Sequence, residues 1–291
     1  MPDVPPMDIA AVVVLYRPDA TVTDNIAACA EQVDTIFAVD NSERPDAAFI
    51  ATLDRCPGVC YIANGANQGI AAAMNVGARA ARDAGFAWLL TMDQDSTVTA
   101  GMVERLRACA LAGPDRIGLV SPVHRQVGAE RQAVPSGCHE VLTAMSSGNL
   151  VNLDALADVG GFMEELFIDQ VDHELCLRLW DSGYRVLEAG DADLIHRVGY
   201  IRRHTFPFRA YSSNHSALRR YYMTRNRLWV ARMYRDTHPE FGRLQRATIL
   251  KDIAKITLWE DHKGRKLAMM WRGARDYRAR RLGAYGASTD S

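Results

Sequence analysis

The stretch Asp93-Gln94-Asp95-Ser96 holds two carboxylates one residue apart, directly after the apolar run of residues 86–92. That run predicts a buried strand of a parallel sheet, and open α/β sheets bind ligands at the carboxyl ends of their strands. Carboxylate oxygens there can hold Mg²⁺ or Mn²⁺, which usually take further oxygens from substrate phosphates. A turn that caps a helix is the alternative for these residues, since Asp and Ser favour both features.

Polar residues also follow two earlier predicted strands. Tyr16-Arg17 comes after the strand of residues 9–15, and Asp40-Asn41-Ser42 comes after the strand of residues 36–39. Because parallel strands end at the same edge of a sheet, these residues and Asp93 are expected to line one cleft. Asp40 could accept the imino N–H of a uracil or thymine ring there, or it could cap the next helix.

The loop of residues 64–69 leads into a predicted helix over residues 69–84. Backbone N–H groups at such a helix start can bind a diphosphate. The loop lacks both Gly-x-Gly-x-x-Gly and Gly-Lys-Ser/Thr, so neither a Rossmann dinucleotide site nor a P-loop is supported. The small residues of the helix predict that it packs closely against the sheet.

A second acidic cluster contains Asp169, Asp172 and Glu174. On a helix over residues 169–181, the side chains of Asp169, Asp172 and His173 would share one face. Repulsion among three carboxylates in one turn should raise the pKa of at least one of them, which suits a proton acceptor. Asp169 could instead cap the helix. Further along, His196 could be a metal ligand or an ordinary core histidine.

Short apolar runs alternate with helical stretches over the first two hundred residues. Further strands are expected at residues 59–62, 117–120 and 184–187, and a helix at 21–32. This alternation predicts an α/β fold with a mostly parallel central sheet flanked by helices. Beyond residue 196 the composition is helical over residues 214–235 and 243–282, with a break at His238-Pro239.

Composition describes an ordinary globular protein, with 48% hydrophobic and 24% charged residues among 291. The N-terminus lacks the pattern of a secretory signal, and no run approaches the roughly 18 apolar residues that would span a bilayer. Cys56 and Cys60 have no second pair at zinc-finger spacing, so metal and disulfide roles are not expected for the cysteines. A reduced, cytoplasmic protein is the default expectation.

The net charge of −1 conceals a strong asymmetry along the chain. Residues 1–196 hold 12 Lys and Arg against 28 Asp and Glu, whereas residues 197–291 hold 22 against 7. The basic C-terminal third could meet an anionic surface, either membrane lipid or nucleic acid. Alternatively, it could form a solvated helical face that is held by salt bridges.

Taken together, the motifs resemble those of family 2 glycosyltransferases, and most closely those of bacterial rhamnosyltransferases. The resemblance covers about residues 8–200, and Tyr221-Tyr222-x-x-Arg225-Asn226 is reminiscent of the same group. The motifs that carry it occur in this order: Leu15-Tyr16-Arg17-Pro18, Val39-Asp40-Asn41-Ser42, Asn67-x-Gly69, Asn75-x-Gly77, Asp93-x-Asp95, Ser147-Gly148-Asn149, Asp169-x-x-Asp172-x-Glu174 and His196.

The resemblance implies a GT-A fold that transfers a sugar from a nucleoside diphosphate with inversion at the anomeric carbon. The catalytic domain would be residues 1–205, with a nucleotide-sugar half over about 1–100 and an acceptor half over about 101–205. Residues 206–291 would form a basic helical C-terminal region. The implied donor is dTDP-L-rhamnose, and a glycan or lipid-linked intermediate of cell-surface polysaccharide, such as lipopolysaccharide O-antigen, would be the acceptor.

The resemblance also assigns roles to individual positions. Asp172 would be the general base, and Asp95 with His196 would hold Mg²⁺ or Mn²⁺. The donor nucleotide would contact Leu15, Tyr16, Arg17, Asp40, Asn41, Asn67, Gly69, Asn75, Asp93 and Gln94. The donor sugar and the acceptor would lie beside Ser147, Gly148, Asn149, Asp169, His173 and Glu174.

Two other activities compete with this prediction. A sugar-phosphate nucleotidyltransferase shares a similar architecture, but its first strand is followed by a Gly-rich loop, and here that position reads Leu15-Tyr16-Arg17-Pro18-Asp19. A UDP-hexose-dependent glycosyltransferase would use nearly the same nucleotide contacts. A module that only binds nucleic acid would leave the acidic motifs without a purpose, so nucleic acid is not an expected partner. The basic region would lie peripherally on the inner membrane, cover the acceptor groove or form a homodimer contact.

Overall fold

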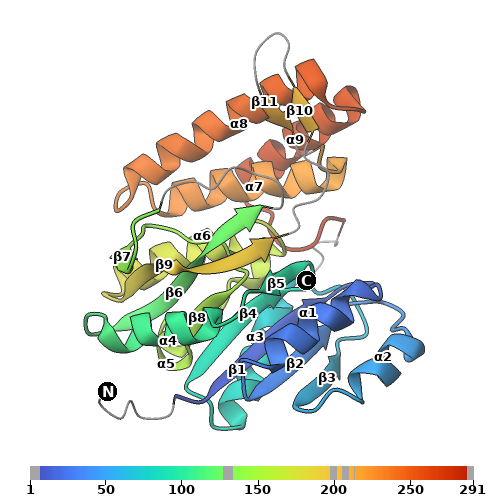
Figure 1. Ribbon diagram of the computed structural model, residues 1–291. Helices are drawn as coiled ribbons and strands as arrows, with labels where there is room; N and C mark the ends of the chain where they lie inside the picture. The colour runs from blue at the N-terminus through green and yellow to red at the C-terminus, as the bar shows by residue number, and fades with distance from the viewer. Residues whose placement is uncertain (1–6, 127–133, 197–201, 205–209, 213, 287–291) are drawn as a thin grey trace. The chain divides into compact units, whose positions relative to one another are not determined.

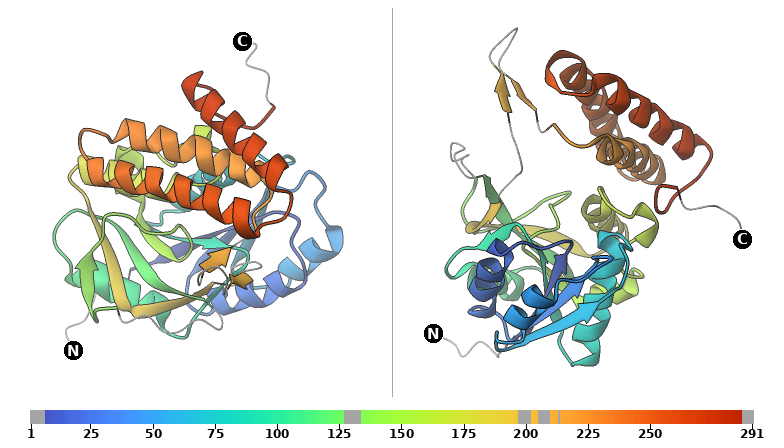
Figure 2. Two further views of the ribbon diagram at one scale, coloured as in Figure 1. Left: turned by 90° about the horizontal axis from the view of Figure 1, so that it is seen from above. Right: turned by 90° about the vertical axis from the view of Figure 1, so that its right-hand side faces the viewer.

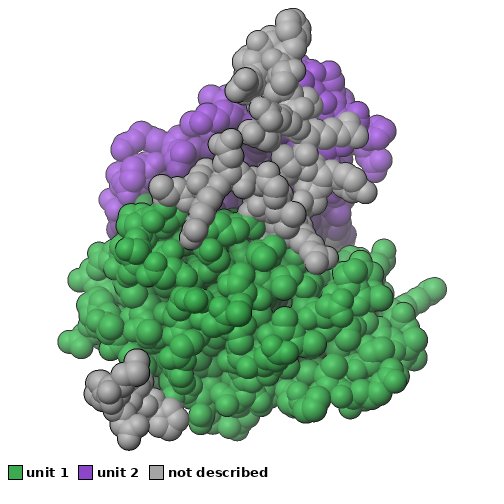
Figure 3. Space-filling view, in the orientation of Figure 1, with its two compact units in different colours: residues 1–164, 175–197 green, residues 165–174, 198–291 purple. Residues whose placement is uncertain are grey.

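The computed structural model describes residues 7–126, 134–196, 202–204, 210–212 and 214–286. The chain forms two compact units, coloured separately in Figure 3. The first unit comprises residues 1–164 and 175–197, and the second comprises residues 165–174 and 198–291. Residues 165–174 thus belong to the same unit as the C-terminal region, and the division of the chain at residue 205 stays a prediction.

The first unit is built on one mixed sheet (Figure 1). Its strands are β1 (Ile9–Leu15), β2 (Thr35–Asp40), β3 (Val59–Ala63), β4 (Trp88–Asp93), β5 (Ser96–Val98), β6 (Ile117–Gln126), β7 (Cys138–Glu140), β8 (Asn149–Asn152) and β9 (Arg185–His196). Their order is β3-β2-β1-β4-β8-β6-β9-β5, and β7 pairs with β9. The N-terminal strands β3, β2, β1 and β4 are parallel, as predicted. Beyond them β8 is antiparallel to both β4 and β6, so the sheet as a whole is less parallel than predicted.

Helices cover both faces of this sheet. They are α1 (Thr21–Ala30), α2 (Ala47–Leu53), α3 (Ile70–Asp83), α4 (Met102–Ala112), α5 (Leu153–Asp158) and α6 (Val171–Asp181), with a short 3₁₀ helix at Glu164–Leu166. Alternate residues of β1 face opposite sides. Ile9 and Val13 join the core with Ile26 of α1, whereas Val12 meets α3. A Cβ on Gly77 would lie 2.2 Å from Val12 Cγ2, so the close helix–sheet packing predicted for this segment is present.

The second unit holds a two-stranded antiparallel ribbon and three long helices that pack on one another (Figure 2). These elements are β10 (Arg202–His204), β11 (Ala210–Ser212), α7 (Ala217–Met233), α8 (Pro239–Trp259) and α9 (Lys263–Arg278). The predicted break at His238-Pro239 is confirmed, since Pro239 is the first residue of α8. The helical region of residues 243–282 is interrupted once more, between Glu260 and His262, where His262 has a left-handed φ of 52°.

Buried ion pairs join these three helices. Glu260, which is 3% exposed, accepts hydrogen bonds from Arg220 of α7 and from Lys266 of α9, whose Nζ lies 2.8 Å away. Arg220 also contacts Asp252 of α8 at 3.2 Å. Some of the positive charge of the basic C-terminal third is therefore neutralised inside the unit, where buried Arg220 and Lys266 have anionic partners.

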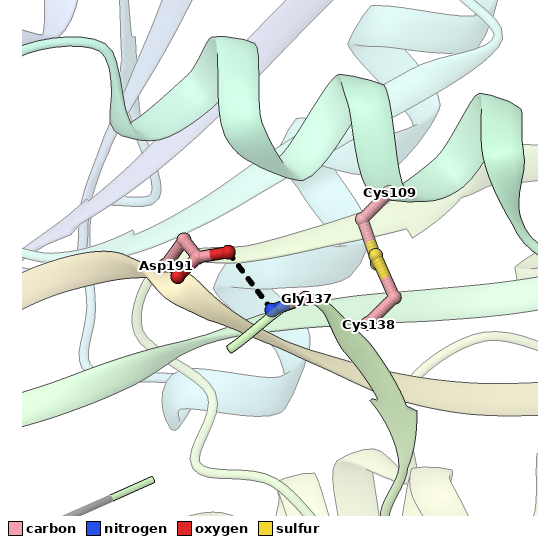
Figure 4. Close-up of a disulfide and its surroundings, with 4 residues drawn as sticks. All are labelled: Cys109, Gly137, Cys138 and Asp191. Carbon is pink, nitrogen blue, oxygen red and sulfur yellow. Dashed lines mark hydrogen bonds between the residues drawn. A yellow bond between two sulfur atoms is a disulfide. The ribbon is translucent and has the colours of Figure 1, made fainter. Parts of the chain in front are cut away.

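One expectation about the cysteines is wrong. Cys109 of α4 and Cys138 of β7 form a disulfide with Cα atoms 5.7 Å apart (Figure 4). Asp191 of β9 lies nearby and accepts a hydrogen bond from the Gly137 N–H at 2.8 Å. The pairing was missed because it depends on β7 running beside β9, which the spacing of the cysteines does not reveal. No helix of the described chain is both long and apolar enough to cross a membrane.

Candidate active site

The carboxyl ends of β1, β2 and β4 are joined by hydrogen bonds. The Arg17 N–H donates to Ser42 Oγ at 2.7 Å, and the Tyr16 N–H donates to Gln94 Oε1 at 2.8 Å. The Asn41 N–H donates to the Leu15 carbonyl, also at 2.8 Å. The structure thus brings the predicted strand-end residues together along one edge of the sheet, here called the donor edge, and their binding roles stay predictions.

Asp40 lies at the centre of this edge and is 1% exposed. Its Oδ1 accepts the Ser42 N–H and its Oδ2 accepts the Tyr61 hydroxyl, both at 2.8 Å. Burial and the Asp40 charge raise the pKa of Tyr61, so Tyr61 stays a proton donor to the carboxylate. Each carboxylate oxygen accepts one of these two hydrogen bonds and has a second lone pair.

The start of α3 is fixed to the same edge. Asn41 Nδ2 donates to the Gly69 carbonyl at 2.9 Å, and Asn64 Nδ2 donates to Asn41 Oδ1 at 2.7 Å. Asn67 Oδ1 accepts the Gly69 N–H at 3.1 Å. Gly69 has a φ of 89°, which a side chain would strain. This loop therefore presents the N-terminus of α3, with its partial positive charge, beside Asp40.

The segment Ser147-Gly148-Asn149 lies next to Asp93 at the end of β4. Ser147 Oγ accepts the Asp93 N–H at 3.1 Å, and the Gly148 N–H donates to the Thr91 carbonyl at 2.6 Å. Gly148 has a φ of 82°, and a Cβ there would lie 2.7 Å from the Pro122 ring, so only glycine fits. Asn149 is 2% exposed, and its Oδ1 has no hydrogen-bond partner among the described atoms.

Asp95 and His196 are brought together by strand pairing. Asp95 is exposed in the turn between β4 and β5, and Ser96 pairs in register with His196 of β9. The carboxylates of Asp93 and Asp95 are hard oxygen donors that suit Mg²⁺ or Mn²⁺, so the residues present fit such an ion. The described side chains, which do not include that of His196, contain no group of three or more His, Cys, Asp or Glu that could hold a metal.

Asn75 has a structural role. Its Nδ2 donates to the Phe162 carbonyl at 2.9 Å and to Glu164 Oε1 at 2.8 Å, and its Oδ1 accepts the Phe162 N–H at 2.8 Å. The amide is 9% exposed and is occupied by these contacts. The structure therefore explains Asn75 as the support of residues 162–164, and its nucleotide contact stays a prediction.

The second acidic cluster lies in the second unit. Residues 169 and 170 are not helical as predicted, because Asp169 and Gln170 have left-handed φ angles of 65° and 69°. Helix α6 begins at Val171 and puts Asp172 in its first turn. Asp172 is half-buried, and its Oδ1 accepts the His173 N–H at 2.8 Å. A carboxylate in this position is favoured by the partial positive charge of the helix start.

The pKa of Asp169 is raised. Burial raises its pKa and repulsion from Asp172 adds to the rise, whereas Arg219 and Arg227 oppose it. The predicted direction is confirmed, but desolvation rather than mutual repulsion is the leading cause. Asp169 Oδ1 lies 3.4 Å from Arg219 Nη2, and Oδ2 is buried with no hydrogen-bond partner among the described atoms.

The other two members of the cluster make contacts within the unit. Glu174 is 1% exposed and accepts the Tyr234 hydroxyl at 2.8 Å. His173 Nδ1 lies 3.0 Å from Gln170 Nε2. These contacts hold the first turn of α6, and the predicted sugar or acceptor contacts of both residues stay predictions.

Sequence reasoning missed several residues that shape the donor edge. Asn64 follows β3 as Asn41 follows β2, so the strand-end rule could have identified it. The Glu43 carboxylate accepts hydrogen bonds from the side chains of Tyr16 and Arg17. A hydrogen bond from its own backbone N–H, and then those from Arg17 and Tyr16, hold the pKa of Glu43 below its usual range. No sequence pattern pointed to Tyr61, because its hydrogen-bond partner Asp40 belongs to another strand.

Comparisons with known proteins agree with this geometry. Residues 10–144 match the model of the family described as Glycosyl transferase family 2. A curated relative, the dTDP-rhamnosyl transferase RfbF of Shigella flexneri, is 29% identical over 245 residues, which are 77% of this chain and 80% of that protein.

Solved structures resemble the chain in fold. GalNAc-T7 with UDP, GalNAc and Mn2+ matches 96% of this chain with a TM-score of 0.63 and 12% identity, and the match spans only 59% of that chain. S. aureus TarS 1-349 matches 92% of this chain with a TM-score of 0.60 and 11% identity, and the match spans 81% of that chain. The predicted fold is therefore confirmed.

Proposed function

We propose that this protein is a glycosyltransferase that moves L-rhamnose from dTDP-L-rhamnose to a hydroxyl of a cell-surface glycan or lipid-linked acceptor, which the family 2 match of residues 10–144 and the rhamnosyl transferase relative support. The observation that carries the proposal is the donor edge, where buried Asp40 is held beside the start of α3 and the Asp93-x-Asp95 motif follows β4. The relative that is itself a dTDP-rhamnosyl transferase supports the choice of donor.

In this proposal Asp40 accepts the N3–H of thymine. Cytosine offers a lone pair at that position, so the carboxylate would repel it and select a thymine or uracil nucleotide. The diphosphate would lie at the N-terminus of α3 near Asn67, where backbone N–H groups and the helix dipole favour negative charge. Tyr16 and Arg17, both partly exposed at the end of β1, would cover the nucleotide from the other side.

Asp95, with Asp93 and His196, would hold Mg²⁺ or Mn²⁺ against the diphosphate. The bound cation would neutralise the charge that collects on the leaving phosphate as the sugar–oxygen bond breaks. Ser147, Gly148 and Asn149 would contact the sugar, because their segment is bonded to Asp93 at the same edge. The unpartnered Asn149 Oδ1 would then accept a sugar hydroxyl.

Asp172 would act as the general base of an inverting transfer. The acceptor oxygen bonds to the anomeric carbon while the carbon–oxygen bond to the diphosphate breaks, and the proton of the acceptor hydroxyl passes to the Asp172 carboxylate. Asp169, His173 and Glu174 would orient this base and the acceptor. General base catalysis of this kind typically contributes about 10²–10⁴-fold.

A comparison of donors tests the proposal. The purified protein is incubated with dTDP-L-rhamnose, UDP-glucose or UDP-N-acetylglucosamine and Mn²⁺, and the released nucleotide is identified by mass spectrometry. We expect release of dTDP from dTDP-L-rhamnose, and its suppression by excess chelator. If UDP is released from the UDP-sugars and no dTDP is released from dTDP-L-rhamnose, the donor is a UDP-sugar. If dTTP forms when pyrophosphate is added, the protein is a nucleotidyltransferase instead.

We further propose that the basic C-terminal region contacts anionic lipid at the cytoplasmic face of the inner membrane. In the second unit, helices α7, α8 and α9 line a pocket of about 380 Å³ to which Arg232, Arg235 and Arg246 contribute. Within the described residues neither Arg232 nor Arg246 makes an ion pair, so both can meet phosphate groups. Co-sedimentation with vesicles containing anionic lipid should fall when Arg232 and Arg246 are both replaced by Ala. Unchanged binding, or a dimer in solution, would favour a contact between subunits.

The cytoplasmic location follows from the proposed nucleotide-sugar donor. Disulfides are rare in that compartment, so the Cys109–Cys138 pair provides an independent test. The structure places the two sulfurs so that they can pair, but a reducing compartment would keep them as thiols, so thiol labelling in freshly lysed cells should find both cysteines reduced. A stable disulfide under those conditions would argue for an oxidising location.

A further inference from the structure

Residues 166–170 adopt a backbone that their own sequence does not favour. Phe167, Asp169 and Gln170 all have φ angles between 65° and 69°, although none of them is glycine. Left-handed conformations are unfavourable for such side chains, so three within four residues persist only where surrounding contacts hold them. The segment lies directly before Val171, the first residue of α6, and its shape therefore sets where α6 begins and where Asp172 lies.

The contacts come from Asn226, in the middle of α7 and 0% exposed. Its Nδ2 donates to the carbonyls of Leu166, Ile168 and Asp169 at 2.8, 2.7 and 3.0 Å. Its Oδ1 accepts Arg225 Nε at 2.9 Å, which turns the amide so that its donors face the loop. One side chain thus binds three of the carbonyls around the left-handed residues.

Arg225 extends the same contact and is also 0% exposed. Its Nη2 lies 3.2 Å from the Leu166 carbonyl, and its Nη1 donates to the Gly283 carbonyl at 2.7 Å. The guanidinium lies 5.3 and 5.0 Å from the ring centres of Tyr221 and Tyr222, which favours the buried cation. Among the described residues Arg225 forms no ion pair, and its hydrogen bonds are made mainly to backbone carbonyls.

We infer that Arg225 and Asn226 are positioning residues of the transferase, which fix the Leu166–Gln170 backbone and thereby the place of Asp172. This inference rests on the proposed role of Asp172 as general base. It explains why Arg225 and Asn226 are polar yet wholly buried: the Asn226 amide and one arm of the Arg225 guanidinium bind carbonyls of the loop that precedes the base. Tyr222 adds to the hold, since its ring stacks on Phe167 at 5.2 Å.

A double-mutant cycle between Asn226 and Asp172 tests the inference. The readout is dTDP release from dTDP-L-rhamnose with Mn²⁺ and water as the acceptor. Asn226→Ser should lower kcat about 10- to 100-fold, because a misplaced catalytic group costs that much, and should change the KM for the donor less than about twofold. In the Asp172→Asn background, the same Asn226→Ser change should lower kcat by less than about twofold.

Thr224→Val provides the matched control. Thr224 is buried on the same helix, and its Oγ1 donates to the Arg220 carbonyl at 2.9 Å, away from the loop. This variant should keep its kcat even where its melting temperature falls. Equal loss of kcat in Thr224→Val and Asn226→Ser would overturn the inference, because both would then act through general destabilisation.

The outcomes for the proposed function and for this inference are distinct. Near-normal turnover of the Asp172→Asn variant would refute the role of Asp172 as general base, and the inference about Arg225 and Asn226 would fall with it. Suppose instead that Asp172→Asn lowers kcat strongly and that Asn226→Ser lowers kcat by the same factor in the wild-type and in the Asp172→Asn background. The two effects are then additive, and only the positioning role would be overturned.

If Asn226→Ser does not fold, Arg225→Lys takes its place in the cycle, because it keeps the charge but loses the forked donors. Hydrogen exchange of that variant should accelerate at the amides of residues 167–171 more than elsewhere in the helices of the second unit. Uniform acceleration would overturn the inference.

Discussion

Replacing Asp40 by Asn tests nucleotide recognition at the donor edge. Asn keeps the Oδ1 acceptor for the Ser42 N–H, and Tyr61 can turn its hydroxyl to accept the new amide, so the fold should tolerate the change. The thymine N3–H would lose a hydrogen bond to a charged acceptor in a site that is 1% exposed. Such bonds are worth about 1.5–3 kcal/mol, so the affinity for dTDP should fall about 10- to 100-fold.

Isothermal titration with dTDP and dCDP, with Mn²⁺ present, measures this effect. We expect the wild-type protein to prefer dTDP, and Asp40→Asn to lose most of that preference, because an amide can donate to cytosine N3. Tyr61→Phe is the control, since it removes a partner of Asp40 but not the carboxylate. An equal loss of affinity for both nucleotides, or unchanged dTDP binding, would refute base recognition by Asp40.

Three further predictions concern the rest of the chain. Asp172→Asn should bind dTDP normally but lose about 10²–10⁴-fold in turnover, measured as dTDP release. Glu260→Gln should lower the free energy of unfolding in urea by about 3 kcal/mol, because buried Lys266 loses its anionic partner and buried Arg220 keeps only Asp252, whereas Glu240→Gln at an exposed site should cost under about 0.5 kcal/mol. The pKa of His215 is lowered from 6.5 to about 4, mainly because the side chain is buried and also because the positive charges of Arg219 and Arg220 lie nearby. The unfolded chain therefore binds the proton first as the pH falls, and stability should drop by roughly 1–3 kcal/mol between pH 6.5 and 4. His215→Gln should flatten that pH dependence, and an unchanged slope would exclude His215 as its source.

The parallel part of the sheet was predictable because its signals are local. The strand predicted at residues 9–15 is β1 without any shift, since an apolar run there ends at Tyr16-Arg17-Pro18. The helix predicted at residues 69–84 is α3, set by Gly69 and a run of small residues. Parallel strands end at the same edge of a sheet, so the residues of the donor edge could be predicted from the sequence once the strands were placed.

The remaining features depend on partners far along the chain. Strand β8 has only four residues, and its antiparallel place between β4 and β6 leaves no periodic pattern to detect. Asp169 was assigned to a helix because its acidic neighbours favour helix starts. Its left-handed backbone is held instead by Asn226, 57 residues later. Such contacts are set by tertiary packing, which local propensity does not encode.

The central claim is that a dTDP-sugar binds at the donor edge of the first unit. The most direct test is a crystal structure with dTDP and Mn²⁺. We expect the thymine N3 within hydrogen-bond distance of an Asp40 oxygen and the cation bound to Asp95 and to the diphosphate. A nucleotide bound elsewhere, with Asp40 and Asp95 contacting neither base nor cation, would contradict the account.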